Sequence, residues 1–428
     1  MAANFLARFG ERLFPDGSLK GIITLSGGSI IGHVVLAASS PLISRLYAPE
    51  EFGLFSIFFS IFGITSIIST LQYHNAIPVP REDRSGAEVF VAAVVILGGF
   101  SLLSFGVLAL AIDWIADLAQ MNAYQSLLWL LPAAIVAANF NLCLQFWFLR
   151  KKEYHNLAIV KGAQSVTMAL GQIGLGLAKL GAIGLIVGHI VGQATGIVQL
   201  LWGVRRRYRE PFGAVRGQGV VDALRTHRSY ATTFTPAAIL GASTVYLPAI
   251  ALGVLYGPAA AGAFAFGLQL SKAGMSILVQ SVSKVFLVNA IDDFNEENRP
   301  AIMRRALKFC FSQFLIGLPI FLPLVFFGEE IFGFLFGDNW AIAGKYVALL
   351  TPHLYTFFVF DHLVNLFIVT GKHQWKLIWD GLKFLVLVAI FVLGQLTDLP
   401  ADQAILFLSI GWASLHLALT PIARRLLR

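Results

Sequence analysis

The sequence predicts an all-α polytopic membrane protein with twelve transmembrane helices in two six-helix lobes. The chain is 57% hydrophobic and 13% charged, with a mean hydropathy of +0.75. Apolar runs recur along its whole length, and about 20 residues in a helix cross the ~30 Å hydrocarbon layer. A short motif also returns in the second half of the chain. The short alternating strands typical of a transmembrane barrel are absent from the pattern.

The predicted spans follow one another with short connections. They are residues 21–43, 52–74, 89–112, 126–149, 157–178, 181–204, 230–254, 259–284, 307–327, 346–369, 375–394 and 402–421. The first six form an N-lobe, residues 21–204, and the last six a C-lobe, residues 230–428. A basic cytoplasmic linker, residues 205–229, joins them. Apolar and charged residues at helical spacing predict an interfacial helix within residues 1–20.

The distribution of Lys and Arg gives the orientation, because short loops rich in these residues stay in the cytoplasm. With the N-terminus placed inside, the loop cations are cytoplasmic except Arg45, Lys179 and Lys345. Both termini are therefore predicted to be cytoplasmic. The many Lys and Arg residues in cytoplasmic loops account for the formal net charge of +8. The basic composition therefore does not lead us to expect nucleic-acid binding.

The motif L-Y-x-P-x-x-x-G-x-F occurs twice, as LYAPEEFGLF from Leu46 and as LYGPAAAGAF from Leu255. Proline interrupts a helix, glycine permits close helix packing, and the aromatic residues suit the membrane interface. A second correspondence, at a slightly larger offset, pairs Asn141 with Asp361. Because each half holds an even number of spans, these are parallel repeats about an axis normal to the membrane.

Lysines within the spans are candidates for binding an anionic headgroup, because a charge at the bilayer centre costs about 2.5–3.5 kcal/mol. Lys272 and Lys383 lie near mid-span, Lys161 and Lys284 nearer the cytoplasmic ends, and Arg45 on the outer side. A structural role is the alternative for each of the four lysines, and for Lys272 it would be snorkelling or a structural pair. Lys161 and Lys284 can snorkel, and Lys383 can pair with an acidic residue of its own helix.

One-sided polar stripes predict a polar cavity, because residues three, four and seven apart share a helix face. The cavity-lining candidates are Ser29, His33, Asn141, Gln145, Gln164, Gln172, Gln269, Ser276, Gln280 and Asn365. Packing between helices is the alternative for the serines and for His33. Asp361 and His362 are candidates for pairing with a lysine or for carrying a coupling proton.

The sequence contains no metal-ligand spacing, phosphate-binding loop or nucleophile motif. We therefore expect no metal, no cofactor and no enzymatic reaction. Cys143 and Cys310 both fall within predicted spans, which argues against a disulfide framework.

Three stretches carry a resemblance to a known family: PLISRLYAPEEFGLFSIFFSI from Pro41, LQYHNAIPVPRE from Leu71 and IFGFLFGDNWAIAGKYVALLTP from Ile331. They resemble the bacterial polysaccharide exporters, or O-antigen flippases, of the multidrug/oligosaccharidyl-lipid/polysaccharide flippase superfamily. The resemblance covers nearly the whole chain. This chain departs from the family pattern at one position: the family commonly has a Tyr-Glu pair where this chain has Tyr73-His74.

This resemblance implies a MATE-like fold and alternating access. It implies that the protein moves an undecaprenyl-diphosphate-linked oligosaccharide from the inner to the outer leaflet of the bacterial cytoplasmic (inner) membrane. The implied partners are this lipid-linked substrate, the bilayer, H⁺ or Na⁺ as a coupling ion, and the polysaccharide polymerase or chain-length machinery.

Three other functions compete with this interpretation. A multidrug antiporter of the same superfamily would be expected to embed acids in its first lobe, and the predicted N-lobe spans contain no Asp or Glu. A lipid II flippase usually has two further helices, for which no sequence follows Arg428. A membrane polysaccharide polymerase or ligase needs a sizeable outer loop, and the longest outer segment, near residues 328–345, is short.

Overall fold

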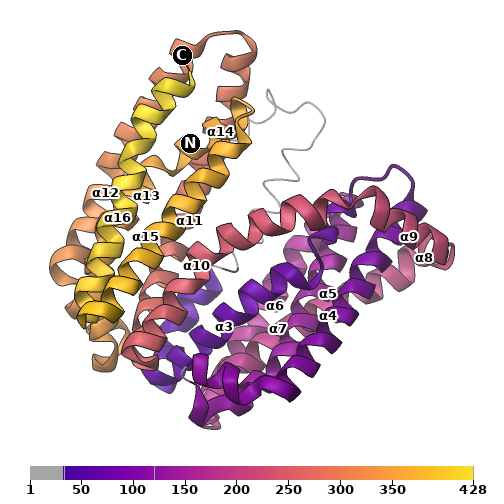
Figure 1. Ribbon diagram of the computed structural model, residues 1–428, viewed down its shortest axis with the longest axis horizontal. Helices are drawn as coiled ribbons and strands as arrows, with labels where there is room; N and C mark the ends of the chain where they lie inside the picture. Colours follow the sequence, from indigo (N-terminus) through magenta and orange to yellow (C-terminus); the bar gives the residue numbers. More distant parts are fainter. Residues whose placement is uncertain (1–31, 33, 120, 428) are drawn as a thin grey trace. The chain divides into compact units, whose positions relative to one another are not determined.

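The computed structural model describes residues 32, 34–119 and 121–427 (Figure 1). In this part of the chain every regular element is a helix, so the all-α fold class is confirmed. The predicted interfacial helix in residues 1–20 and most of the first span lie outside the described residues. So do two cavity candidates, Ser29 and His33.

The helices of the first half follow the predicted spans. They are Val34–Leu46, α3 (Pro49–Ser69), α4 (Asp83–Leu118), α5 (Leu131–Arg150), α6 (Tyr154–Leu177) and α7 (Ala182–Arg207). Two 3-10 helices, η1 (Tyr73–Ala76) and η2 (Asn122–Leu130), precede α4 and α5. The residues predicted as a linker also contain helices, α8 (Arg209–Gly213) and α9 (Gly217–Thr226).

The second half begins with a turn of π-helix, η3 (Tyr230–Phe234). The helices that follow are α10 (Thr235–Tyr256), α11 (Pro258–Asn295), α12 (Arg299–Phe336), α13 (Ala341–Phe360), α14 (Asn365–Val369), α15 (His373–Thr397) and α16 (Ala401–Leu426). The 3-10 helices η4 (Asp338–Trp340) and η5 (Asp361–Val364) lie on either side of α13. α11 bends by 46° between Ser276 and Leu278.

These helices suit a bilayer. Within the described residues, nine helical segments are long and apolar enough to cross a membrane, and the two parts of α11 together make a tenth. α6 is also 24 residues long, but it carries polar side chains that include Lys161 and Gln164. Leu110 and Phe334 are 91% and 85% exposed. Such large apolar side chains are stable at a surface that faces lipid.

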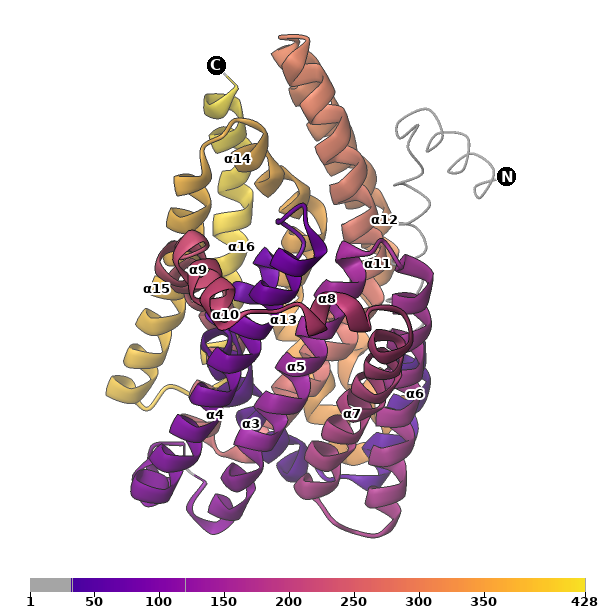
Figure 2. The same ribbon diagram turned by 90° about the vertical axis from the view of Figure 1, so that its right-hand side faces the viewer.

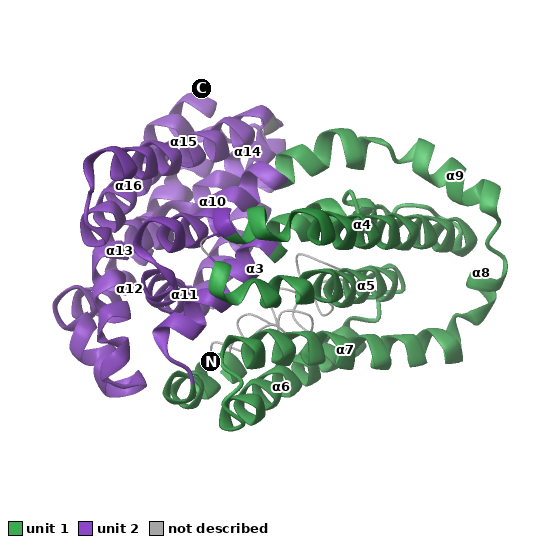
Figure 3. Ribbon diagram, turned by 60° about the horizontal axis from the view of Figure 1, so that its bottom comes forward, with its two compact units in different colours: residues 1–46, 62–116, 122–238 green, residues 47–61, 117–121, 239–428 purple. Residues whose placement is uncertain are grey.

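The helices group into two compact units (Figure 3). Unit 1 contains the described residues before Tyr47, together with Phe62–Ala116 and Asn122–Ala238. Unit 2 contains Tyr47–Ile61, Asp117–Met121 and the described residues from Ile239 onward. The first turns of α3 are therefore grouped with the second half of the chain. The lobe boundaries at residues 204 and 230 remain a prediction.

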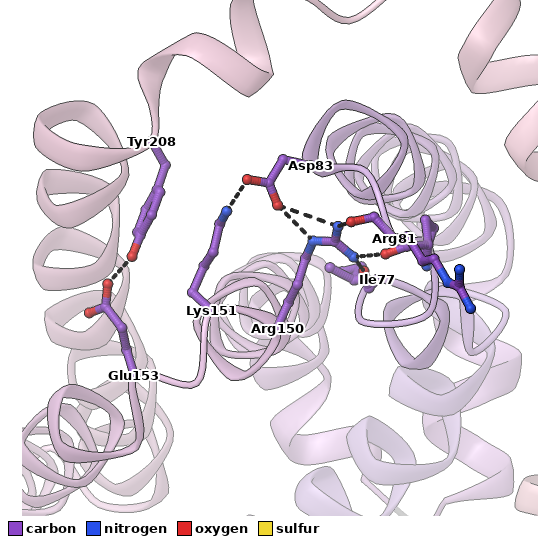
Figure 4. A network of polar contacts seen from close by, with 8 residues as sticks. Ile77, Arg81, Asp83, Arg150, Lys151, Glu153 and Tyr208 are labelled. Carbon is purple, nitrogen blue, oxygen red and sulfur yellow. Dashed lines mark hydrogen bonds and ion pairs between the residues drawn. The ribbon is translucent and has the colours of Figure 1, made fainter.

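Unit 1 is tied together at the ends of α4 and α5 by Arg150 (Figure 4). Its guanidinium forms an ion pair with Asp83 at 3.3 Å, and Lys151 pairs with the same carboxylate. The guanidinium also donates to three backbone carbonyls, those of Ile77, Pro80 and Arg81. The Arg150 side chain is only 6% exposed. These bonds satisfy a buried cation and hold the connection before α4 against α5.

A second ion pair joins α6 and α7 at the same end of unit 1. Glu153 pairs with Arg207 at 2.8 Å and accepts a hydrogen bond from the Tyr208 hydroxyl (Figure 4). Burial, together with the neighbouring Glu153 carboxylate, raises the pKa of Tyr208 to about 12. The phenol therefore stays a hydrogen-bond donor throughout the physiological pH range.

α9 is held against the start of α4 within unit 1. The Tyr73 hydroxyl donates to the Leu224 carbonyl at 2.8 Å. A Cβ on Gly219 would lie 2.1 Å from Oε1 of Glu88, so the backbone of α9 passes close to this carboxylate. The part of the predicted linker that forms α9 therefore packs against the rest of unit 1.

In unit 2 the two copies of the repeated motif lie against each other. Pro49 starts α3 and Pro258 starts α11. A Cβ on Gly53 would lie 1.7 Å from the Pro258 carbonyl oxygen, and a Cβ on Gly262 would lie 2.0 Å from the Pro49 carbonyl oxygen. The motif keeps glycine in both copies because no larger residue fits at this crossing.

α15 and α16 lie side by side in unit 2 (Figure 2). Leu387, Leu408 and Trp412 form a buried apolar cluster between them. The Trp412 indole donates to the Lys383 carbonyl at 3.1 Å. This contact fixes the helix that carries one of the predicted anion-binding lysines.

Candidate functional site

Two of the predicted lysines and the predicted acid lie in one region of unit 2. Lys272 is on α11, Lys383 on α15 and Asp361 on η5, and all three are half-buried. Asp361 acts electrostatically on both lysines. Among the described residues, neither lysine forms an ion pair of 4.0 Å or less with a carboxylate. Two ammonium groups therefore share one acid at longer range, which leaves positive charge for an anion.

The local salt bridge considered for Lys383 involves another lysine. Lys376 pairs with Asp380 one turn later in α15. Lys383 instead lies over the ring of Trp379, with Nζ 5.5 Å from the ring centroid. An aromatic face stabilises an ammonium without neutralising it. Lys383 therefore keeps its charge available to a ligand.

Asp361 stands at a break in the helix that follows η4. α13 ends at Phe360, and the chain passes through the 3-10 turn of η5 before α14 begins at Asn365. Short 3-10 turns within a helix often accompany functional positions. The Asn365 side chain donates to the Ser283 carbonyl of α11 at 3.1 Å. This bond holds the turn against the helix that carries Lys272.

His362 is adjacent in sequence, but its ring is enclosed by aromatic residues. Its centroid lies 5.0 Å from that of Phe286 and 6.0 Å from that of Phe309. Its Nε2 lies 3.4 Å from the Ala306 carbonyl oxygen and 3.8 Å from Sγ of Cys310. The ring therefore packs against α11 and α12.

The polar candidates of unit 1 form a separate cluster. Asn141 on α5 donates to Gln193 on α7 at 2.7 Å, and the Gln193 amide nitrogen lies 3.4 Å from Nε2 of His189. Gln164 on α6 lies against Gly196: a Cβ on Gly196 would be 2.1 Å from Nε2 of Gln164. Oδ1 of Asn141 and Nε2 of Gln164 are buried and have no hydrogen-bond partner among the described residues. The sequence pattern missed Gln193 and His189.

The remaining candidates are more scattered. Gln172 is buried and donates to the Leu185 carbonyl at 3.2 Å, while Ser276 donates to the Ala273 carbonyl of its own helix. Both hydrogen bonds are structural. Lys161 and Gln145 are half-buried in unit 1. The exposed candidates are Arg45 in unit 1 and Gln269, Gln280 and Lys284 in unit 2.

The sequence pattern also missed two buried histidines near the lysines. His353 on α13 is 5% exposed and His416 on α16 is 0% exposed, and their ring centroids lie 5.3 Å apart. His353 lies in the same predicted span as His362, and His416 lies in the last span, so no spacing pattern links His353 with His416. In the described part of the chain, no group of three or more His, Cys, Asp or Glu side chains could hold a metal ion.

A cavity of about 600 Å³ lies in unit 1 between the start of α4 and α9. Its walls carry Glu82, Glu88, Arg84, Arg216 and His227. Arg84 is already paired with Glu88 at 3.1 Å. Charges of both signs line this space, so it lacks the single-sign field that an anionic headgroup requires.

The chain matches a family model described as "Polysaccharide biosynthesis protein" over residues 42–344. No curated protein matches it. Two solved structures share its fold. One is a multidrug resistance MATE family transporter of the MOP superfamily, inward-facing, with a TM-score of 0.68, 14% identity, and coverage of 95% of this chain and 98% of that chain. The other is the lipid II flippase MurJ, inward closed, with a TM-score of 0.73, 12% identity, and coverage of 94% and 87%.

A third solved structure is a MOP superfamily transporter from Pyrococcus furiosus whose binding pocket is described as reversed in polarity. It has a TM-score of 0.57 and 14% identity, with 95% of each chain covered. The resemblance to polysaccharide exporters is confirmed, since the family model covers most of the chain. This protein is a multi-pass membrane protein with the fold of MOP superfamily transporters, and it belongs to the polysaccharide biosynthesis protein family.

Proposed function

We propose that this protein is a flippase that carries an undecaprenyl-diphosphate-linked oligosaccharide from the cytoplasmic to the outer leaflet of the bacterial inner membrane. The observation that carries the proposal is the pair Lys272 and Lys383, two half-buried ammonium groups for which Asp361 is the one described carboxylate that acts on both. A diphosphate supplies the missing negative charge. Membership of a polysaccharide biosynthesis family supports a glycan as the rest of the substrate.

The lysines suit the part of the substrate that all such lipids share. An ammonium is a compact charge that binds phosphate oxygens without demanding one geometry. An unpaired charge is expensive within a membrane, so the two lysines are poorly explained as packing residues. A carrier of organic cations would require the opposite sign at this position.

The amides of unit 1 suit the glycan. Each sugar hydroxyl that leaves water needs a hydrogen-bond partner. Asn141 and Gln164 each retain a buried polar atom without a partner among the described residues. We assign binding of the glycan to Asn141, Gln145, Gln164 and the other polar candidates. We propose that the protein carries the bound substrate by alternating access. The lipid tail stays in the bilayer.

The membrane potential favours this direction of transport. A diphosphate carries about two negative charges, and moving each outward is favourable by ~2.3 kcal/mol per 100 mV when the inside is negative. Asp361 then neutralises a lysine while the empty carrier returns, or carries a coupling ion, H⁺ or Na⁺.

A polysaccharide polymerase or its chain-length machinery would take the product at the outer face of the membrane. Both termini of the flippase would lie in the cytoplasm.

The deciding experiment deletes the gene and measures lipid-linked oligosaccharide on each side of the membrane. We expect the intermediate to accumulate on the cytoplasmic side and to be exported again when the wild-type gene is restored. A Lys272→Ala gene should not restore export, although its protein reaches the membrane. Unchanged sidedness after deletion would exclude the flippase. Unpolymerised oligosaccharide accumulating outside would indicate a polymerase or ligase.

A further inference from the structure

The buried histidines His353 and His416 suggest how the lysine site handles charge. We propose that they form a proton-binding site coupled to the anion site, so that a diphosphate bound at Lys272 and Lys383 draws one proton onto the histidine pair. The proton leaves when the anion leaves. This inference rests on the proposed function, because it takes the two lysines as the anion site.

The first observation is that the two rings belong together. The ring centroids lie 5.3 Å apart with an interplanar angle of 37°. The backbone N–H of His353 donates to the Ser409 hydroxyl at 3.1 Å, which fixes α13 against α16 at this level. The ring of Trp412 covers His353, with centroids 4.9 Å apart. These contacts hold the two histidine rings in fixed positions within unit 2.

The second observation is that both rings have an unused nitrogen. Nδ1 of His416 lies 2.8 Å from the Trp412 carbonyl oxygen, which can only accept, so Nδ1 carries the hydrogen in neutral His416. Nε2 of His416 is then a bare acceptor. That atom and Nδ1 of His353 are buried without a partner among the described residues. Each ring therefore has a nitrogen that can accept a proton without breaking a hydrogen bond among the described residues.

The third observation is the set of charges that act on the pair. Lys272 on α11 and Lys383 on α15 both act electrostatically on His353, and Lys383 also acts on His416. Asp361 on η5 acts on both lysines, and Lys383 is influenced as well by Lys376 and Asp380 on its own helix. No further charged group acts on either ring in the part of the chain that the structure describes. Burial itself opposes a charge on either ring, and the two ammonium groups add to that opposition until an anion neutralises them.

The charge balance gives the stoichiometry. Lys272, Lys383 and Asp361 together carry one positive charge. A bound diphosphate, with about two negative charges, makes the loaded site negative by about one. One proton on the histidine pair makes it neutral, and a neutral site costs least in a low-dielectric interior. Anion and proton thus bind with positive cooperativity, and each must raise the affinity for the other by the same factor.

The proposal is tested with the full-length protein and farnesyl-diphosphate-linked N-acetylglucosamine as the probe, because this diphosphate is esterified at both ends and carries about two negative charges, as the charge balance assumes. Calorimetry at pH 7.5, in two buffers with different ionisation enthalpies, measures the protons taken up per bound diphosphate. We expect about one proton for the wild type and none for the double variant His353→Gln/His416→Gln. The double variant should still bind the probe, because its lysines are intact. His362→Gln, another buried histidine of unit 2, is the matched control and should retain the uptake.

Each outcome decides between the claims. Proton uptake that is unchanged in the double variant overturns the histidine site and leaves the lysine site standing. Failure of the wild type to bind the probe, or equal binding by Lys272→Ala, refutes the anion site itself. If the double variant does not fold, His416→Gln alone is measured, because glutamine can still donate to the Trp412 carbonyl. Full proton uptake by that single variant overturns the claim that the two rings bind the proton as a pair.

Discussion

Gly53 and Gly262, the matching glycines of the repeated motif, pack backbone to backbone where α3 crosses α11. A Cβ on Gly262 would lie 2.6 Å from the nitrogen of Gly53 and 3.0 Å from its Cα. The rings of Phe52 and Phe266 flank the crossing, with centroids 5.1 Å apart. The motif is repeated because each copy supplies one side of the same contact.

Alanine at either glycine should destabilise the protein. The added methyl group meets backbone atoms that cannot move aside, so Gly53→Ala and Gly262→Ala should each cost about 1–3 kcal/mol. Thermal unfolding of the detergent-purified protein measures this effect. Gly99→Ala in α4 is the control, because nothing lies within 4 Å of the position of its Cβ. A melting temperature that is the same in all three variants would contradict the close crossing.

Lys272 should be required for export rather than for folding. Lys272→Ala should abolish export while the amount of protein in the membrane stays normal. Lys272→Arg should retain part of the activity, since the charge remains although its geometry changes. Lys179→Ala, which removes an exposed lysine after α6, is the control and should export normally. Wild-type export by Lys272→Ala would assign Lys272 to packing.

Arg150 should stabilise unit 1 more than any exposed cation at the same end. Arg150→Met leaves three backbone carbonyls without their donor and leaves Asp83 paired with Lys151 alone, and unsatisfied acceptors of this kind should cost about 1–3 kcal/mol. Arg150→Lys should recover only part of the loss, because an ammonium lacks the planar fork of donors. Thermal unfolding compares both variants with Arg205→Met, at an exposed position on α7. Equal losses for positions 150 and 205 would refute the assignment.

His74 should make stability depend on pH. It lies beyond the end of α3, where burial lowers its pKa to about 4. The Asn75 amide donates to its Nε2 and its Nδ1 contacts the Thr70 hydroxyl at 2.8 Å, so a second proton would displace the Asn75 bond. The unfolded chain takes up that proton near pH 6.5, whereas the native protein takes it up only near pH 4. Stability should therefore fall as the pH drops from about 6.5 to 4.

The variant His74→Gln should lose this part of the acid sensitivity. Melting temperatures measured from pH 7.5 to 4.5 in detergent give the comparison. His155→Gln, at an exposed position on α6, should retain the wild-type profile. If His74→Gln shows the same acid-induced loss as the wild type, His74 is not the source.

Cysteine labelling tests the orientation. In a background without Cys143 and Cys310, a cysteine at Asn339 should react with an impermeant thiol reagent in whole cells. A cysteine at Ala214, between α8 and α9, should react only after the cells are opened. Both positions are exposed, and neither has the positive φ of Gly337, where a cysteine would be strained. The reverse labelling pattern would invert the predicted topology.

The sequence by itself determined the fold class, the helices and the main charged candidates. Each span is a local property, because a run of apolar residues long enough for the bilayer forms a helix whatever its neighbours are. Lys272 and Lys383 were identifiable for the same reason, since the cost of a charge within a span does not depend on its partner. The repeated motif likewise predicted a close helix contact from proline and glycine alone.

Only the tertiary structure decided which side chains face one another. Helical periodicity says which residues share a face, but the rotation and depth of each helix are set by packing against residues far away in sequence. This is why Asn141 was identified without Gln193, and Asp361 without the 3-10 turn that carries it. The pairing of His353 with His416 depends on how α13 packs against α16. No local pattern records that packing, because it arises from side-chain complementarity between helices that are distant in the chain.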